Sequence, residues 1–234
     1  MTFSTMADSR IPPVNRRSFV APALAVAAVV VFFGLPGLGG EALDLWFQSF
    51  FWNGKAWLIP HDHPLGQALA YDGPKALIII WALLLIGAAV FAKRVRVRAL
   101  YLLACLAVVS VVCTQLRAVT GMATPLELKA FGGVHDHLLL FQTKPAGYPS
   151  HAFPAGHASG GFALLGLYWI LKSRRWRGLA LGLGVGCWMG FYQIARGEHF
   201  LSHTLATAAL AWLLCVGLAY LMRKPLEREV SSPS

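Results

Sequence analysis

Two short polar segments stand next to long apolar stretches, and both carry histidines. Residues 153–161 place His157 just before one apolar run, and residues 196–203 place His199 and His203 at the start of another. A histidine can attack phosphorus or protonate a leaving oxygen, and an arginine such as Arg196 binds phosphate oxygens. These residue types at two neighbouring apolar ends indicate phosphoryl chemistry.

The elements that carry these segments are apolar enough to cross a membrane. The chain of 234 residues is 57% hydrophobic and 13% charged, with a mean hydropathy of +0.59. A helix of about twenty residues crosses the ~30 Å hydrocarbon layer. We predict an all-α integral membrane bundle, a single domain over residues 1–234, with about six transmembrane helices near residues 19–38, 74–92, 98–116, 157–173, 177–195 and 203–222.

Basic residues gather on alternate connections between these spans, at residues 10–17, 93–98, 172–177 and 223–228. By the positive-inside rule these connections are cytoplasmic, as are tails at 1–18 and 225–234, and the long connections near 39–73 and 117–156 face outward. The net charge of +10 therefore reflects topology, and we expect no nucleic-acid partner. The expected location is the inner (cytoplasmic) membrane, with the site facing the periplasm or exterior. Arg16 and Arg17 also resemble an export signal, but a run of span length favours a retained helix.

This topology predicts that four polar side chains meet at the outer rim of the bundle. Arg117 ends the third span, His157 begins the fourth, Arg196 ends the fifth, and His199 lies before the sixth. Two histidines and two arginines from separate segments form a better phosphate site than a lone interfacial histidine does. We therefore expect an active site at the extracytoplasmic rim.

The spacing of these residues resembles the type 2 phosphatidic acid phosphatase (PAP2) superfamily. Its three motifs are Lys-x6-Arg-Pro, Pro-Ser-Gly-His and Ser-Arg-x5-His-x3-Asp, and the similarity extends over residues 115–207. Residues 196–203, Arg-Gly-Glu-His-Phe-Leu-Ser-His, are most similar to the acid-phosphatase branch. The resemblance implies a membrane lipid phosphatase, a phosphoric ester or diphosphate hydrolase that needs no metal or other cofactor.

Several positions depart from the first two motifs. Arg117 stands at the Lys of the first motif, and Thr124 stands where the family has Arg. In the second motif Gly156 and His157 match, whereas Ala155 replaces the Ser. Arg117 keeps a positive charge and can bind phosphate through two donors.

The third motif keeps its nucleophile, His199, but has Gln193 at the Arg position and His203 at the Asp position. On a helix Arg196 lies only about 60° around from position 193, so its long side chain can replace the missing arginine. Ser159, one turn beyond the replaced Ser, can supply a hydroxyl. Lys129 and Lys144 in the outer loop can also attract an anionic headgroup.

The resemblance implies a two-step reaction. His199 attacks phosphorus to give a phosphohistidine, His157 protonates the leaving oxygen, and water then releases phosphate. Arg117 and Arg196 stabilise the charge on the transferring group, with Gly156, Ser159, Thr124 and Lys144 as further phosphate contacts. His203 is expected to orient His199. A second register would make His203 the nucleophile.

Two other functions remain open from the sequence. One is a phosphotransferase that passes the phosphoryl group to a second lipid, and the other is a non-catalytic binding or transport protein on a decayed PAP2 scaffold. Transport is disfavoured because the span interiors lack ionisable residues. The expected partners are the membrane and a lipid phosphate or diphosphate, but the sequence does not identify the lipid.

Two His-Asp-His triplets, at residues 61–63 and 135–137, have the residue types of metal ligands. Their spacing fits no well-defined metal site, so exposed or structural roles are expected.

Overall fold

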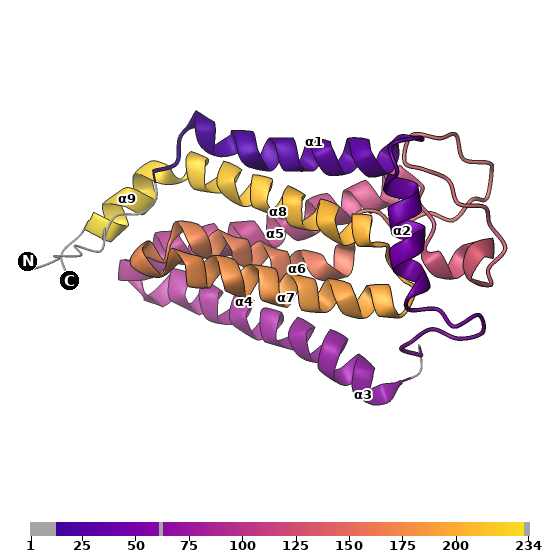
Figure 1. The fold of residues 1–234 in the computed structure, drawn as a ribbon. Helices are drawn as coiled ribbons and strands as arrows, with labels where there is room; N and C mark the ends of the chain where they lie inside the picture. The colour runs from indigo at the N-terminus through magenta and orange to yellow at the C-terminus, as the bar shows by residue number, and fades with distance from the viewer. Residues whose placement is uncertain (1–12, 61–62, 232–234) are drawn as a thin grey trace, which may run out of the picture.

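Long helices packed side by side form one bundle in the computed structural model, which describes residues 13–60 and 63–231 (Figure 1). The five long helices of this part of the chain are apolar and long enough to cross a membrane, which supports a multi-pass membrane protein. They are α1 (Val20–Gly34), α4 (Gly73–Phe91), α5 (Arg96–Thr120), α7 (Arg175–Ala195) and α8 (Leu201–Leu221).

Shorter elements join them, and the described residues contain no strand. They are α2 (Gly40–Ser49), α3 (Pro64–Gln67), α6 (Ser159–Ala163) and α9 (Arg223–Ser231). Seven 3-10 turns are found among these residues, at Arg16–Phe19, Lys93–Val95, Pro125–Glu127, Lys129–Phe131, Gly156–Ala158, Leu164–Trp169 and Lys172–Arg174. A π-helical turn covers Ala68–Asp72.

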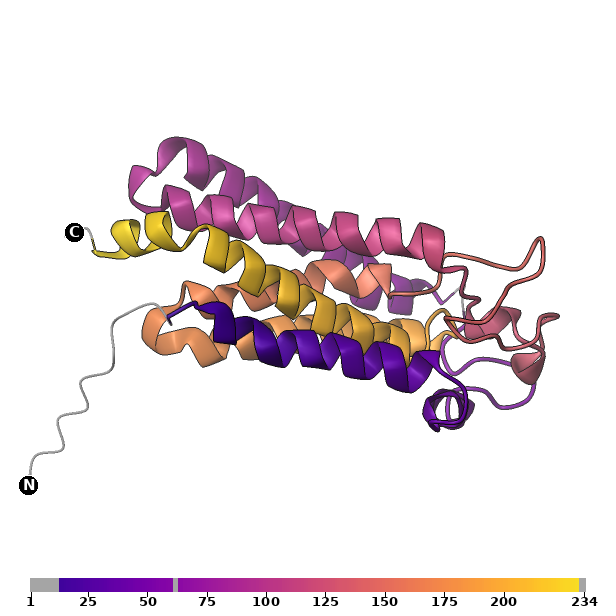
Figure 2. The ribbon, with the colours of Figure 1, turned by 90° about the horizontal axis from the view of Figure 1, so that it is seen from above.

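The two ends of the bundle differ in their connections. The start of α1 lies near α9 at one end, whereas α2 and the long connection after α5 lie at the other (Figures 1 and 2). The basic turn Lys93–Val95 joins α4 to α5, and the basic turn Lys172–Arg174 lies directly before α7. This is the arrangement that the distribution of basic residues predicts.

The predicted fourth span, near 157–173, is helical but broken into the 3-10 turn Gly156–Ala158, α6 and the 3-10 turn Leu164–Trp169. It packs against α5, α7 and α8, so that Phe162 and Leu165 are fully buried. Close approach depends on glycine, because a Cβ at Gly186 would overlap the Phe162 ring. The central position of this segment places its outer end within reach of three neighbouring helices.

Glycines of α7 do not all serve this packing. Small residues let helix backbones meet in lipid, so the sequence predicts close helix approach at Gly182, Gly184, Gly186 and Gly190. For Gly184 this is wrong, because a Cβ there would have no neighbouring atom within 4 Å. Gly184 faces open space instead of another helix.

Helix α2 lies across the ends of the long helices that are opposite α9 (Figure 1). Buried Asp44 accepts a hydrogen bond from the Ser202 amide at 2.9 Å, and buried Gln48 donates to the Ile194 carbonyl at 2.8 Å. The first bond satisfies a free amide at the start of α8, and the second satisfies a carbonyl near the end of α7. Helix α2 therefore fixes the two helix ends that flank His199.

At the opposite end α9 caps α5. Glu229 accepts hydrogen bonds from the amides of Val97 and Arg98, at 2.6 and 3.2 Å, and from the Arg98 side chain at 2.9 Å. A carboxylate is favourable at a helix N-terminus because it satisfies free amides and complements the helix dipole.

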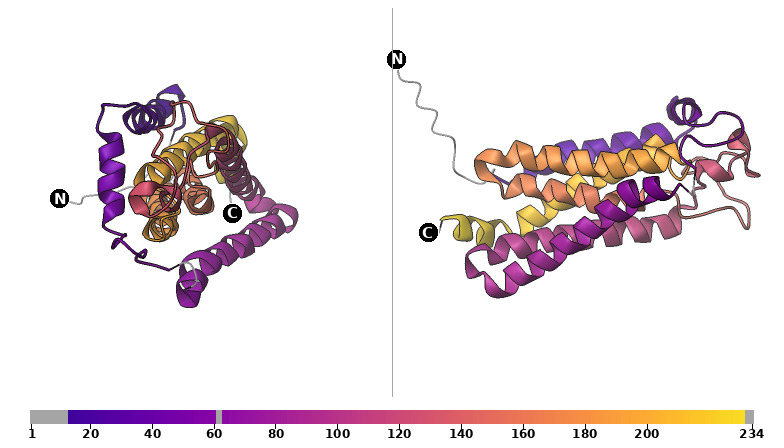
Figure 3. Two further views of the ribbon diagram at one scale, coloured as in Figure 1. Left: turned by 90° about the vertical axis from the view of Figure 1, so that its right-hand side faces the viewer. Right: turned by 90° about the horizontal axis from the view of Figure 1, so that it is seen from below.

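Helix α4 lies at the edge of the bundle, as an end-on view shows (Figure 3). It packs mainly along α5, and most of its large apolar side chains are exposed. In a bilayer such a surface contacts lipid chains, so α4 combines a lipid-facing side with a side that faces the bundle interior.

Candidate active site

A cavity of about 300 Å³ opens near the α2 end of the bundle, between α4, α5 and the segment that leads into α6. Its lining combines cationic, hydroxyl and imidazole side chains with apolar ones. The lining residues are Tyr71, Lys75, Ile78, Ile79, Ser110, Thr114, Arg117, Gly156, His157, Ser159, Gly160 and Met189. Of the sequence-predicted residues, the structure thus brings Arg117, Gly156, His157 and Ser159 to one cavity.

Arg117 is held at the last turn of α5 by the loop that precedes His157. Its Nε donates to the His151 carbonyl at 2.6 Å, and His151 has a φ of 95°, which is uncommon for a residue with a side chain. A Cβ at Gly156 would lie 2.6 Å from a terminal nitrogen of Arg117. A side chain at this position would displace the guanidinium from its present place, so Gly156 allows Arg117 to lie beside His157.

The imidazole rings of His157, His199 and His203 lie in a row, with His157 at the wall of the cavity. His157 Nδ1 is 3.3 Å from His199 Nε2, and His199 Nδ1 is 3.5 Å from His203 Nδ1. The turn between α7 and α8 carries His199, and the first turn of α8 carries His203. His199 and His203 are almost completely buried. The row allows His199 to present one nitrogen toward His157 while the other faces His203.

Burial also affects the charge of these rings. Burial, together with the neighbouring His203 and His157, lowers the pKa of His199 well below its usual value. Burial and the positive charges of Arg117, Arg196 and Lys75 lower the pKa of His157 to about 4. At neutral pH both rings are therefore neutral without a bound anion, as a nucleophilic imidazole must be.

Backbone hydrogen bonds join the His157 segment to α8. The Ala155 amide donates to the His203 carbonyl at 3.1 Å, and the Thr207 hydroxyl is 3.1 Å from the Ala155 carbonyl and 2.9 Å from the His203 carbonyl. These bonds fix the entry to α6 against the first turn of α8. His157 and His199 consequently meet although 42 residues separate them.

Arg196 and Gln193 lie beside the cavity without lining it. A terminal nitrogen of Arg196 donates to Gln67 at 2.8 Å and lies 3.4 Å from the Tyr192 hydroxyl. Its guanidinium also lies over the Tyr192 ring, 5.1 Å from the centroid. Gln193 is buried, and its carbonyl accepts the Glu198 amide. Arg196 is close enough to His157 to influence its charge, as noted above.

Two predicted phosphate ligands lie elsewhere. Thr124 caps the turn Pro125–Glu127, where its amide and hydroxyl bond Glu127 at 2.7 and 2.9 Å. Lys144 donates to the carbonyls of Leu139 and Leu140, each at 2.7 Å. Neither residue lines the cavity, because local loop structure uses their polar atoms.

Sequence reasoning missed four polar residues of the lining. Tyr71 and Lys75 come from the start of the α4 segment, and the Tyr71 ring centroid lies 5.2 Å from that of His157. Ser110 and Thr114 precede Arg117 by seven and three residues, so their helical spacing was a usable signal. Lys75 offered another signal, since it is a cation at the predicted outward end of a span.

The His-Asp-His triplets do not gather into a metal site. In the second triplet Asp136 pairs with Lys129 at 2.8 Å, and His137 lies 3.0 Å from Glu41. In the first, His63 accepts the Gly66 amide, and residues 61–62 lie outside the described residues. Residues 13–60 and 63–231 contain no group of three or more potential metal ligands.

A model of the PAP2 superfamily matches residues 98–227, more than half of the chain. The chain belongs to the PAP2 superfamily. The matched region includes Arg117 and the three histidines, whereas Tyr71 and Lys75 lie before it. Among curated proteins no match was found.

A solved structure supports this PAP2 assignment at the level of the fold. The chain is similar to a transmembrane PAP2 type phosphatidylglycerolphosphate phosphatase from Bacillus subtilis, with a TM-score of 0.60 and 13% sequence identity. The similarity covers 88% of this chain and 96% of that protein. The similarity in fold therefore extends well beyond residues 98–227.

Proposed function

We propose that this protein is a lipid phosphatase that hydrolyses a lipid phosphomonoester or diphosphate at the extracytoplasmic surface of its membrane. The observation that carries the proposal is the pair His157 and His199, 3.3 Å apart beside a cavity that Arg117 lines. The membership in the PAP2 superfamily supports the same chemistry. The transmembrane phosphatase with a similar fold also agrees with a lipid substrate.

In the proposed reaction His199 Nε2 attacks phosphorus while the bond to the leaving oxygen breaks. His157 gives that oxygen a proton, and the product lipid departs as an alcohol or a monophosphate. A water then attacks the phosphohistidine, His157 takes its proton, and inorganic phosphate leaves. Arg117 and Arg196 stabilise the negative charge on the transferring group.

His203 is proposed as the residue that orients the nucleophile. The usual partner of a nucleophilic imidazole is a carboxylate that accepts its second N–H. At 3.5 Å, neutral His203 Nδ1 can take that role if His199 Nδ1 carries the proton. The surrounding packing also favours His199 as nucleophile, because His199 separates His203 from His157.

The first experiment combines substitutions with trapping of the intermediate. We expect His199→Ala and His157→Ala to lower phosphate release from lipid phosphates by roughly a thousandfold or more, with unchanged membrane insertion. Rapid quenching with a labelled phosphate ester should give an acid-labile phosphoprotein in the wild type and none in His199→Ala.

Three results would contradict parts of this proposal. Full activity of folded His199→Ala would exclude it as nucleophile, and an inactive His203→Ala with an active His199→Ala would support the other register. Label that moves to a second lipid without phosphate release would identify a phosphotransferase.

A further inference from the structure

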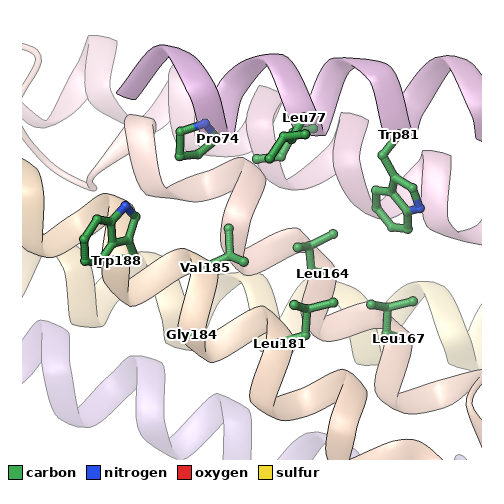
Figure 4. Close-up of a pocket in the computed structure, with 10 residues that line it drawn as sticks. Pro74, Leu77, Trp81, Leu164, Leu167, Leu181, Gly184, Val185 and Trp188 are labelled. Carbon is green, nitrogen blue, oxygen red and sulfur yellow. The ribbon is translucent and has the colours of Figure 1, made fainter. Parts of the chain in front are cut away.

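An apolar groove runs along the lipid-facing side of the bundle between α4, α7 and the 3-10 turn Leu164–Trp169 (Figure 4). Its volume is about 430 Å³. Pro74, Leu77 and Trp81 follow one another along α4, with Leu164, Leu181 and Val185 on the opposite side (Figure 4). The remaining lining residues are Ile78, Leu167, Gly184 and Trp188. The lining contains no charged side chain, so the groove suits a hydrocarbon ligand.

This groove adjoins the polar cavity of the active site. Lys75 on α4 and Tyr71 in the π-helical turn before it line the cavity. Leu77 and Trp81 of α4 line the groove, and Ile78 lines both. The spacing of these residues places the two hollows on neighbouring faces of one helix. The polar hollow lies toward the outer end of α4, and the groove continues toward the bilayer interior. An amphiphile with its phosphate at the rim would have its chains pointing in this direction.

Gly184 keeps one part of the groove open. A Cβ at this position would meet no atom within 4 Å. Gly186, two residues further along α7, instead packs against Phe162. Helix packing therefore accounts for Gly186 and leaves Gly184 unexplained. As a lining residue of the groove, Gly184 provides width for something that the chain itself does not supply.

We propose that the groove binds one hydrocarbon chain of the phosphate-bearing lipid while its phosphate occupies the adjoining cavity. This inference rests on the proposed function and extends it to the tail of the substrate. The volume of the groove lies within the range of about 300–1,000 Å³ that small-molecule sites have. Apolar contacts along α4 and α7 would stabilise the bound chain by removing its surface from water or disordered lipid.

The test fills the groove at the position that the fold leaves empty. Gly184→Leu adds an apolar side chain there, and Gly87→Leu is the matched control, because Gly87 of α4 also has no atom within 4 Å and does not line the groove. Turnover is measured with dioleoyl phosphatidic acid in detergent micelles and with p-nitrophenyl phosphate, which has no chain.

We expect Gly184→Leu to lower kcat/KM for phosphatidic acid by about tenfold or more and to leave the small ester within about twofold. Gly87→Leu should change neither value. Equal values for Gly184→Leu and Gly87→Leu on phosphatidic acid would overturn the inference. So would an equal loss on both substrates, since that result indicates disturbed packing.

A second measurement does not depend on turnover. Phosphatidic acid with a photoreactive diazirine in one chain should label peptides that contain Leu77 or Leu181, less in Gly184→Leu than in Gly87→Leu. Unlabelled phosphatidic acid should compete for labelling, and diacylglycerol should not.

Two outcomes would contradict the inference. Labelling without competition would mean that ordinary bilayer lipid fills the groove. Cross-links between two protein chains would mean that the groove is a protein interface. If the wild type hydrolyses neither substrate, the proposed function fails and labelling still decides the groove.

Discussion

A cation on α4 faces the same cavity as the two groups of the proposed chemistry, Arg117 and His157. Lys75 projects from the start of the helix, with its Nζ 5.6 Å from the Tyr71 ring centroid. The family pattern has an arginine at position 124, where this chain has a threonine that caps a loop turn. Lys75 is therefore well placed to restore a positive charge near the phosphate.

We expect Lys75→Gln to lower kcat/KM for a lipid phosphate by about tenfold to a hundredfold, because a charge-assisted contact contributes about 1.5–3 kcal/mol. Lys75→Arg should retain most of the activity. The matched control is Lys93→Gln, at the opposite end of α4, which should have no effect. Equal activity of Lys75→Gln and the control would exclude contact between Lys75 and the phosphate.

The lowered pKa values predict greater activity in acid. The reaction needs neutral His199 and protonated His157, and the pKa of His157 is about 4. As pH falls from 8 to 5, protonated His157 becomes more abundant, whereas His199 stays neutral because its pKa lies well below the ordinary value near 6.5. We expect kcat/KM to rise over this range.

Ionisation of the substrate acts in the same direction, since a phosphate monoester has a second pKa near 6. The Lys75→Gln variant distinguishes the ionisation of His157 from the ionisation of the substrate as the cause of the pH dependence. Removing its positive charge should raise the pKa of His157 and move the pH profile upward, and it leaves the substrate unchanged. An identical profile in wild type and Lys75→Gln would assign the pH dependence to the substrate.

At the scale of an element, α2 acts through Asp44. We expect Asp44→Ala to lower the free energy of unfolding by about 1–2 kcal/mol, because the Ser202 amide loses its acceptor at the start of α8. Asp44→Asn keeps an acceptor and should be close to wild type at pH 5. Thermal unfolding in detergent measures both variants.

The direction in which pH changes the stability of the protein provides a second test of Asp44. Burial raises its pKa to about 7, partly opposed by the bond to Ser202. The folded protein therefore holds this proton more tightly than the unfolded chain, and the resulting stability is lost as pH rises from about 4 through 7. Wild type should lose stability relative to Asp44→Asn between pH 5 and pH 8. A constant difference would contradict the raised pKa.

Apolar length and basic clusters were sufficient to predict the all-α membrane fold, because bilayer thickness determines how long a spanning helix must be. They were insufficient for the fourth span, which the structure divides into two 3-10 turns and α6. Gly184 illustrates the same limit, since a glycine has one sequence signature whether it faces a helix or an empty groove.

The site was predictable where motif spacing fixed it, at Arg117, His157 and His199. It was not predictable for Thr124 and Lys144, because loop carbonyls and a glutamate bind their polar atoms. Tyr71 lies outside the matched motifs, and its approach to His157 depends on how α4 packs across the bundle. Tertiary contacts of this kind leave no spacing pattern in the sequence.

At the scale of the whole molecule, the orientation in the membrane is a prediction. We expect reporters fused after Lys93 and Arg175 to be cytoplasmic and those near Lys55 and Phe141 to be extracytoplasmic, because the basic connections stay inside. Fusion reporters that are active on only one side of the membrane measure this. A cytoplasmic signal near Phe141 would place the site at the inner leaflet and contradict the proposed surface.

The contact between His157 and His199 has a consequence for how the protein discriminates between lipid phosphates and small soluble phosphates. A phosphorus atom poised for attack needs to lie about 3–3.5 Å from His199 Nε2, a space that His157 occupies at 3.3 Å. Inserting a phosphoryl group must separate the two rings, and the free energy for this step has to come from binding elsewhere on the substrate. A lipid supplies it through its chain, whereas small soluble phosphates lack that part. The resting contact would thus act as an induced-fit filter that favours lipid phosphates over small soluble phosphate esters, which are turned over more slowly.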